Sequence, residues 1–192
     1  MRFAVMASGR GSNFQALIDA HARGELPGAE LVQLIVNKRD AQAVARAKAA
    51  GIPWAFIDSE AMPRAEFDRR ALAVLRDCGA DAVVLAGFMR ILKGEFLRAF
   101  EGRVVNVHPS LLPSFPGLEA WKQALDHGVK YAGVTVHYVD QGIDSGPIIE
   151  QEPVRVRGDD TPESLCARIQ EVERVLYPKA ISTVVERLRD EG

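Results

Sequence analysis

Short apolar runs alternate with helical patterns along the first 108 residues, and this alternation constrains the possible folds more than any other feature. The runs that indicate strands are almost continuously apolar, and they cover residues 2–7, 30–37, 52–58, 80–87 and 102–108. The segments with helical patterns cover residues 12–21, 40–51, 63–77 and 91–100. Continuously apolar strands separated by helices are typical of a parallel sheet covered on both faces. The sequence therefore predicts a doubly wound, Rossmann-like α/β fold, in which ligands bind at the carboxyl ends of the strands.

The pattern changes in the last third of the chain. Two β-rich segments, 132–139 and 146–156, are separated only by the short sequence DQGIDS. They must be antiparallel, because a parallel crossover needs roughly a dozen or more residues. A long helix follows, with Thr161 as its expected N-cap and Pro162 as its first residue. We expect one domain over residues 1–192, built on a mostly parallel sheet with an antiparallel C-terminal strand and a long C-terminal helix.

The charge and the apolar runs of the chain argue against several classes of partner. A formal net charge of -2 and a pI near 6.1 give no overall basic character, so nucleic acid is not an expected partner. No apolar run approaches the roughly 18 residues that span a membrane. Cys78 and Cys166 lack Cys or His neighbours at metal-ligand spacing, which favours two isolated thiols in a reducing compartment. We expect a cytoplasmic protein without a bound metal, as a monomer or a weak homodimer.

A glycine-containing stretch, ASGRGSNF at residues 7–14, follows the first expected strand and begins the first helix. Gly9 and Gly11 match the start of a dinucleotide-binding fingerprint, but Phe14 occupies the position of its third glycine. A dinucleotide is therefore not indicated. The backbone N–H groups of residues 11–13, at a helix N-terminus, would suit a phosphate monoester. A turn capped by its own Ser or Asn would explain the same residues, and both interpretations stay open.

Asn106 and His108 lie at the end of the fifth expected strand, in the sequence NVHPSLLPSFPG. Strand side chains alternate, so the two point to one face, at the carboxyl end where a doubly wound fold binds its ligands. There an Asn can donate to a developing oxyanion, and a His can transfer a proton near neutral pH. The prolines that follow end the strand and stiffen its exit. A core histidine beside an Asn that simply ends the strand remains the alternative.

The antiparallel segments contain further candidates. Thr135 and His137 share one face of their strand, and we expect a structural or supporting role for them. The connection DQGIDS contains Asp140 and Asp144. A hairpin aspartate commonly serves turn chemistry, but a carboxylate folded over the strand ends would favour the charged form of His108. The spacing does not distinguish which aspartate faces the histidine.

Three stretches together resemble a known family: ASGRGSNF, NVHPSLLPSFPG and GVTVHYVDQGIDSGPIIEQ, in this order and at these separations. The chain resembles the phosphoribosylglycinamide formyltransferases of purine biosynthesis, among the formyl-folate-dependent transferases, from its first strand to its last helix. The resemblance implies transfer of a formyl group from the co-substrate 10-formyltetrahydrofolate to the amine of 5'-phosphoribosylglycinamide, through a tetrahedral intermediate and without a metal. It also implies a phosphate-binding half at about residues 1–100 and a folate-binding, catalytic half at about residues 101–192.

The resemblance implies roles for individual residues. Asn106 would bind the formyl oxygen, and His108 would donate the proton and stabilise the oxyanion. Asp144 would hold His108 in its charged form or order a proton-shuttling water. The residues implied for the substrate phosphate are Gly11, Ser12, Asn13 and Arg64, and those for the ribose and glycinamide are Gln170 and Glu173. The implied folate-binding residues are Met89, Arg90, Ile91, Leu92, Asn106, Asp140, Gln141, Gly142, Ile143 and Asp144.

Other formyl-folate enzymes and one unrelated class remain as alternatives. Methionyl-tRNA formyltransferase resembles the chain around Asn106 and His108 but carries an additional tRNA-binding domain. Formyltetrahydrofolate deformylase is similar as well and has an N-terminal regulatory domain, whereas the first expected strand begins here at Arg2. A non-catalytic Rossmann-like module that binds a phosphorylated metabolite would leave Asn106, His108 and Asp144 unexplained.

Overall fold

The computed structural model describes residues 1–190. Within them, seven strands form one sheet in the order β3-β2-β1-β4-β5-β6-β7. The strands are β1 (Arg2–Ala7), β2 (Glu30–Val36), β3 (Trp54–Phe56), β4 (Ala82–Leu85), β5 (Val104–His108), β6 (Tyr131–Tyr138) and β7 (Ile148–Arg155). All pairs among β1 to β5 are parallel, and β6 runs antiparallel to both β5 and β7. The predicted mostly parallel sheet is confirmed, and its strand order reverses between β1 and β4, where doubly wound folds bind ligands.

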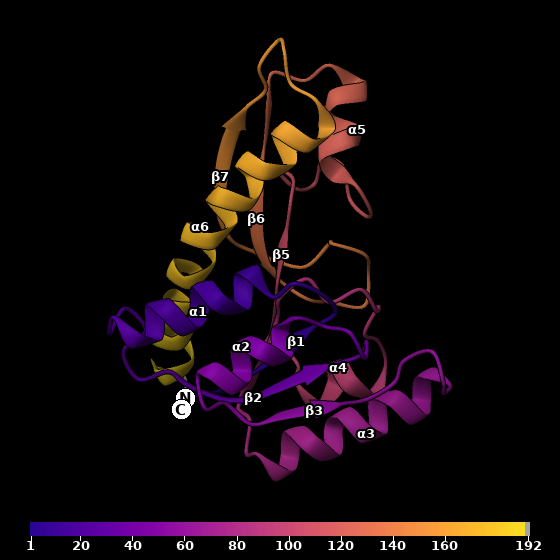
Figure 1. Ribbon diagram of the computed structural model, residues 1–192, viewed down its shortest axis with the longest axis vertical. Coiled ribbons are helices and arrows are strands. Elements are labelled where there is room, and N and C mark those ends of the chain that lie inside the picture. The colour runs from indigo at the N-terminus through magenta and orange to yellow at the C-terminus, as the bar shows by residue number, and fades with distance from the viewer. Residues whose placement is uncertain (191–192) are drawn as a thin grey trace.

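Helices cover both faces of this sheet (Figure 1). Within residues 1–190 they are α1 (Ser12–Ala22), α2 (Ala43–Ala49), α3 (Arg64–Asp77), α4 (Glu95–Ala99), α5 (Ala120–His127) and α6 (Pro162–Asp190). The alternation of side chains along β1 divides the core in two. Phe3, Val5 and Ala7 pack in the cluster that contains α1, α2 and α6, whereas Ala4 and Met6 pack in the cluster that contains α3 and α4.

Helix α6 begins as the sequence predicted and is fastened to the sheet near its middle. The Thr161 hydroxyl oxygen accepts a hydrogen bond of 3.2 Å from the backbone N–H of Ser164, which caps the first turn. Tyr177 is fully buried, and its hydroxyl lies 2.8 Å from the carbonyl oxygen of Leu85 and 3.1 Å from that of Val105. The helix is therefore tied to β4 and β5. None of the helices within residues 1–190 combines the length and apolar character that crossing a bilayer requires.

The predicted strands and helices are confirmed with shifted ends, and one helix was missed. The helix expected at residues 91–100 is only the short α4, because Gly94 before it adopts φ 59° and ψ -120°. No element is predicted between the fifth strand and residue 132, yet α5 lies there. This helix is only eight residues long and is preceded by Glu119 in the left-handed conformation without a side-chain cap, so the sequence carries no ordinary helix start there.

Candidate active site

Four polar side chains lie on one face of the sheet where β5 pairs with β6. In the antiparallel register, Asn106 is opposite His137 and His108 is opposite Thr135. Val107, between Asn106 and His108, packs in the core on the side of α1 and α6. The two predicted residues therefore point to the other face, as the alternation of a strand requires. The carboxyl end of β5 thus carries a cluster that combines an amide, two imidazoles and a hydroxyl.

Both ring nitrogens of the buried His108 face hydrogen-bond acceptors. Its Nε2 lies 2.9 Å from the carbonyl oxygen of Phe115, and its Nδ1 lies 3.3 Å from Oδ2 of Asp144. The same Oδ2 accepts a hydrogen bond of 2.9 Å from the backbone N–H of Gly117, which holds the carboxylate in place. A neutral imidazole has one N–H, so only the imidazolium form can donate to both acceptors. The arrangement suits a histidine that carries a proton beside a carboxylate.

The loop between β6 and β7 uses its two aspartates differently. Oδ1 of Asp140 accepts hydrogen bonds from the backbone N–H of Gly142 at 2.9 Å and from the hydroxyl of Ser145 at 2.8 Å. These contacts are turn chemistry. Asp144 instead faces His108, and it adopts φ 49°, in the left-handed region that few non-glycine residues occupy. The question left open by the sequence is therefore answered: Asp144 faces the histidine and Asp140 shapes the loop.

His137 orients the side chain of Asn106. Nδ1 of His137 lies 2.8 Å from the carbonyl oxygen of Tyr138, so this nitrogen carries a proton. Burial lowers the pKa of His137 below its ordinary value of 6.5, although the nearby Asp144 carboxylate opposes the shift. The ring is therefore neutral near pH 7, and its Nε2 accepts from Nδ2 of Asn106 at 3.4 Å. Within residues 1–190 the amide has no other hydrogen bond, which leaves its second N–H for a ligand.

Thr135 supports the proline-rich segment that follows β5. Its hydroxyl donates to the carbonyl oxygen of Ser110 at 2.7 Å and accepts from the backbone N–H of Leu112 at 3.0 Å. Gln151 of β7 donates to the Thr135 hydroxyl and to the Leu112 carbonyl oxygen, at 2.9 Å each. The Leu112–Pro113 peptide bond in this segment is cis. Strands β6 and β7 thus fasten the segment whose Phe115 carbonyl contacts His108.

The glycine loop leads from β1 into α1. Gly11 precedes the helix with φ 68°, a conformation that glycine adopts without strain. A Cβ atom at Gly11 would lie only 2.8 Å from Cβ of Ala43, so α2 leaves no room for a side chain there. Among the described residues no side chain caps α1, and its first backbone N–H groups are therefore available to an anion. The alternative interpretation, a turn capped by its own Ser or Asn, does not describe this loop.

Helix α6 reaches the glycine loop at two points. Nδ2 of Asn13 donates to Oε2 of Glu173 at 2.9 Å, and Arg10 donates to Oε1 of Gln170 at 3.1 Å. Burial raises the pKa of Glu173, and the hydrogen bond from Asn13 opposes this shift. Oδ1 of Asn13 is also buried but accepts no hydrogen bond within residues 1–190. A buried acceptor without a donor is unusual in a folded protein and indicates a place for a ligand donor.

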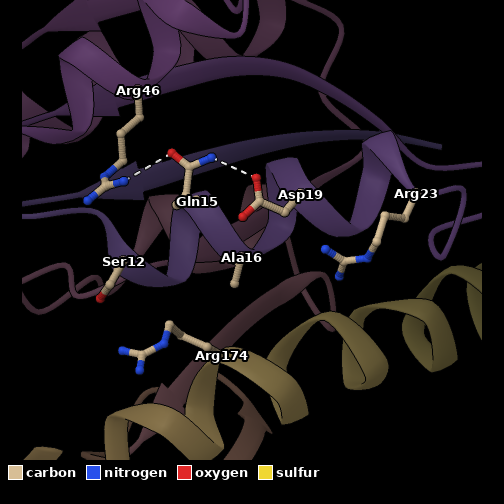
Figure 2. Close-up of a pocket in the computed structure, with 7 residues that line it drawn as sticks. All are labelled: Ser12, Gln15, Ala16, Asp19, Arg23, Arg46 and Arg174. Atoms are coloured by element: carbon tan, nitrogen blue, oxygen red, sulfur yellow. Dashed lines mark hydrogen bonds between the residues drawn. The ribbon is translucent and has the colours of Figure 1, made fainter.

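A groove of about 390 Å³ lies beside the loop, between α1, α2 and α6 (Figure 2). It is lined by Ser12, Gln15, Ala16, Asp19, Arg23, Arg46 and Arg174. Arg46 donates to Gln15 at 3.0 Å, and Gln15 donates to Asp19 at 2.8 Å, so one wall is a continuous hydrogen-bonded row. Glu25 neutralises Arg23, so Arg46 and Arg174 supply the positive charge that makes the part of the groove near the loop attractive to anions. Neither Arg46 nor Arg174 was predicted from the sequence, and only Arg174 had a signal there, its position beside Glu173.

Residues 89–92, implied to bind folate, extend beyond the end of β4. The backbone N–H of Met89 donates to the hydroxyl of Ser8 at 2.8 Å, which anchors the segment to the end of β1. Met89 and Ile91 are exposed, whereas Leu92 is buried in the core formed with α3 and α4. Exposed apolar side chains next to a polar cluster are typical of the wall of a small-molecule site.

The loop at residues 140–146 contacts the chain that follows this segment. Oε1 of Gln141 accepts a hydrogen bond of 3.1 Å from the backbone N–H of Gly94. Ile143 is exposed near the middle of the loop, and Gly142 donates to Asp140 as part of its turn. The loop at residues 140–146 is therefore linked to the chain two residues beyond the segment 89–92.

Arg64 is the predicted phosphate-binding residue that has no contact with the glycine loop within residues 1–190. It is the first residue of α3, in the layer that covers the sheet opposite α1. Its charge acts on Asp68, one turn further along α3, and Arg90 acts on the same carboxylate. The assignment of Arg64 to the phosphate stays a prediction.

The site combines a helix N-terminus without a side-chain cap, a histidine that faces a carboxylate, and an amide oriented by a second histidine. On a doubly wound sheet, such a set of groups at the carboxyl ends of the strands is typical of a group-transfer enzyme. A family profile described as Formyl transferase matches residues 1–181. The chain belongs to this formyl transferase family.

Relatives with long matches to the chain narrow this assignment. The Bacillus subtilis phosphoribosylglycinamide formyltransferase is 40% identical over 96% of this chain and 94% of that protein. The Drosophila melanogaster trifunctional purine biosynthetic protein adenosine-3 is 44% identical over 96% of this chain, which spans only 14% of that longer protein. The crystal structure of glycinamide ribonucleotide transformylase 1 from Symbiobacterium toebii gives a TM-score of 0.94 at 45% identity, over 97% of this chain and 88% of that one.

Proposed function

We propose that the protein transfers the formyl group of 10-formyltetrahydrofolate to the amine of 5'-phosphoribosylglycinamide, the acceptor for which its relatives are named. The observation that carries the proposal is the His108–Asp144 pair beside Asn106. This cluster ends β5, while the glycine loop follows β1 and residues 89–92 follow β4. Since β1, β4 and β5 are neighbours in the sheet, the three parts of the site adjoin one another.

The ribonucleotide would bind on the side of the glycine loop. Its phosphate would accept hydrogen bonds from the backbone N–H groups of Gly11, Ser12 and Asn13, where the N-terminus of α1 favours negative charge. Two buried acceptors, Oδ1 of Asn13 and the carboxyl group of Glu173, would receive the hydroxyl groups of the ribose or the glycinamide. Gln170 lies one turn before Glu173 on α6 and would complete this wall.

Asn106 and His108 would act on the formyl group. As the amine nitrogen bonds to the formyl carbon, the formyl oxygen gains negative charge, and donors from Asn106 and His108 stabilise it. The bond between the formyl carbon and folate N10 then breaks. The proton lost by the amine moves to N10, through His108 or a water held by Asp144. In the structure Nε2 of His108 faces the Phe115 carbonyl oxygen. With substrate bound, the N–H at Nε2 would be shared between this carbonyl and the formyl oxygen or N10. No metal is required, because folate already activates the formyl group.

A formyl-folate hydrolase would use the same cluster with water as the acceptor, so the test must vary the acceptor. We would follow consumption of 10-formyltetrahydrofolate by absorbance, with and without phosphoribosylglycinamide, and identify the formylated product. Consumption that depends on the amine is expected. Equal consumption without the amine would indicate a deformylase, and no consumption in either mixture would indicate a binding module; both results would contradict the proposal.

A further inference from the structure

Helix α2 holds the glycine loop by two of its backbone carbonyl groups. The backbone N–H of Ala43 donates to the carbonyl oxygen of Gly9 at 3.1 Å. Nε of Arg46, one turn further along α2, donates to the carbonyl oxygen of Arg10 at 2.8 Å. In a planar trans peptide group the carbonyl and the N–H point in opposite directions. The N–H of Gly11, which shares its peptide group with the Arg10 carbonyl, therefore points away from Arg46.

This N–H of Gly11 is one of three that converge at the start of α1. Gly11 is in the left-handed conformation, with φ 68° and ψ 32°, and Ser12 is the first residue of the helix. A left-handed residue followed by a right-handed one turns successive backbone N–H groups toward a common point, which forms an anion-binding concavity. The groups here belong to residues 11–13, and no acceptor for any of them is found within residues 1–190.

The Arg10–Gly11 peptide group can turn over, because a glycine follows its carbonyl. Such a rotation changes ψ of Arg10 and φ of Gly11 in opposite directions, and glycine adopts φ of either sign. The preceding peptide group is held by α2, and the following one by the bond of 2.9 Å from the N–H of Gln15 to the Gly11 carbonyl. Within residues 1–190, Arg46 is the only donor to the Arg10 carbonyl. Loss of this donor would let the Gly11 N–H leave the concavity.

The side chain of Arg46 is itself held in position. Its Nη1 donates to Oε1 of Gln15 at 3.0 Å, and Nε2 of Gln15 donates to Oδ1 of Asp19 at 2.8 Å (Figure 2). Its Cδ lies beside Gly11, since a Cβ atom built there would be 3.4 Å away. The planar guanidinium group thus places one donor on each of two acceptors. A lysine would keep the charge but lacks this fork of donors.

We propose that Arg46 is a positioning residue for the substrate phosphate. Its hydrogen bond orients the Arg10–Gly11 peptide group, so that the N–H of Gly11 joins those of Ser12 and Asn13 on the phosphate. The inference rests on the proposed function and adds to it a residue that acts through the backbone of the loop. Oδ1 of Asn13, buried without a donor within residues 1–190, independently indicates a ligand at this place.

The kinetic test compares Arg46→Lys, which keeps the charge, with Arg46→Met, which removes it. We expect both to raise the KM for the ribonucleotide about tenfold, the loss of a hydrogen bond to a charged group. The KM for 10-formyltetrahydrofolate should stay within about twofold. The matched control is Arg23→Met, which alters an arginine of the same groove that is paired with Glu25, and both KM values should be unchanged. A wild-type ribonucleotide KM in Arg46→Lys, or equal rises in both KM values, would overturn the inference.

A binding measurement separates this inference from the proposed function, because it needs no formyl transfer. Ribose 5-phosphate is added to the ¹⁵N-labelled protein, and the backbone amide signals are followed by NMR. In the wild type and in Arg23→Met, the signals of Gly11, Ser12 and Asn13 should all shift. In Arg46→Lys the Gly11 signal should shift much less than the other two. Equal Gly11 shifts in both proteins, or no shift in the wild type, would contradict the role of Arg46. The expected pattern in a protein without formyl transfer would refute the proposed function and support that role.

Discussion

Oδ2 of Asp144 lies 3.3 Å from Nδ1 of His108, and the backbone N–H of Gly117 holds the same oxygen at 2.9 Å. Three separate stretches of chain therefore meet at one carboxylate: the end of β5, the proline-rich segment and the loop before β7. The carboxylate thereby fixes the orientation of the His108 ring at the end of β5.

Removal of either member of this pair should reduce catalysis. We expect His108→Asn and Asp144→Asn each to lower kcat by about 10²-fold or more, the loss typical of one oxyanion donor. Steady-state formyl transfer measures the change, and circular dichroism checks the fold. Asp126→Asn, an exposed aspartate of α5, is the control and should retain wild-type turnover. If either site variant kept a kcat within about threefold of the wild type, the assigned role would be wrong.

The glycine loop provides a matched pair of positions. Gly11→Ala should raise the KM for the ribonucleotide about tenfold and change the KM for folate much less. An alanine at φ 68° costs roughly 1–2 kcal/mol, and its Cβ would clash with Ala43, so the loop must shift. Gly9→Ala is the control, since a Cβ there has no heavy atom within 4 Å. Separate KM measurements for the two substrates decide the matter. A rise confined to the folate KM would contradict the phosphate assignment.

We expect Glu173 to lower the stability of the fold at neutral pH and to contribute to binding of the ribonucleotide. Burial raises the pKa of Glu173 above its ordinary value of 4.5. Above about pH 4.5 the folded state therefore binds more protons than the unfolded state, and the free energy of unfolding falls as the pH rises through the folded pKa. Glu173→Gln removes this cost and should be more stable than the wild type in urea at pH 7, with the difference vanishing near pH 4. It should also raise the KM for the ribonucleotide about tenfold. Glu171→Gln, exposed on the same helix, should do neither.

The elements that could be predicted from the sequence are those with a local signal. Parallel strands buried on both faces leave continuous apolar runs, so β1, β2, β4 and β5 were found. The common face of Asn106 and His108 follows from alternation alone. Whether Asp140 or Asp144 meets the histidine depends on the path of a loop, and spacing along the chain does not contain that path.

Contacts between a helix and the sheet it covers could not be predicted from the sequence, because they too depend on the path of the chain in space. Arg90 appears in the sequence only as part of a stretch that resembles a folate-binding segment. Its position over Phe67 exists because α3 packs behind β4. Helix α5 was missed because it is short and begins without a side-chain cap, so no start signal marks it in the sequence. The sequence thus indicates the residues that contact ligands better than those that support them.

The neutral state of His137 predicts a pH dependence of stability. Burial lowers its pKa, so below about pH 6.5 the unfolded state binds more protons than the folded state, and stability falls with falling pH. One such group contributes a slope of at most about 1.4 kcal/mol per pH unit. Urea denaturation between pH 5 and 7 should therefore give a smaller slope for His137→Gln than for the wild type. His21→Gln, an exposed histidine of α1, controls for the loss of any histidine. An unchanged slope in His137→Gln would refute the neutral assignment.

The hydroxyl of Tyr177 should contribute to stability through β4 and β5. It is the only hydrogen-bond donor of this buried side chain, and it lies within 2.8 Å and 3.1 Å of the Leu85 and Val105 carbonyl oxygens. Tyr177→Phe leaves these carbonyls with one donor fewer, at a cost of about 1–3 kcal/mol. For a chain of this length the melting temperature should fall by about 2–10 °C. Tyr131→Phe is the control, because that side chain is half exposed and its hydroxyl has only a 3.5 Å contact with Arg155. Differential scanning calorimetry compares the two. Equal melting temperatures for both variants would mean that the Tyr177 hydroxyl contributes nothing measurable to the attachment of α6 to the sheet.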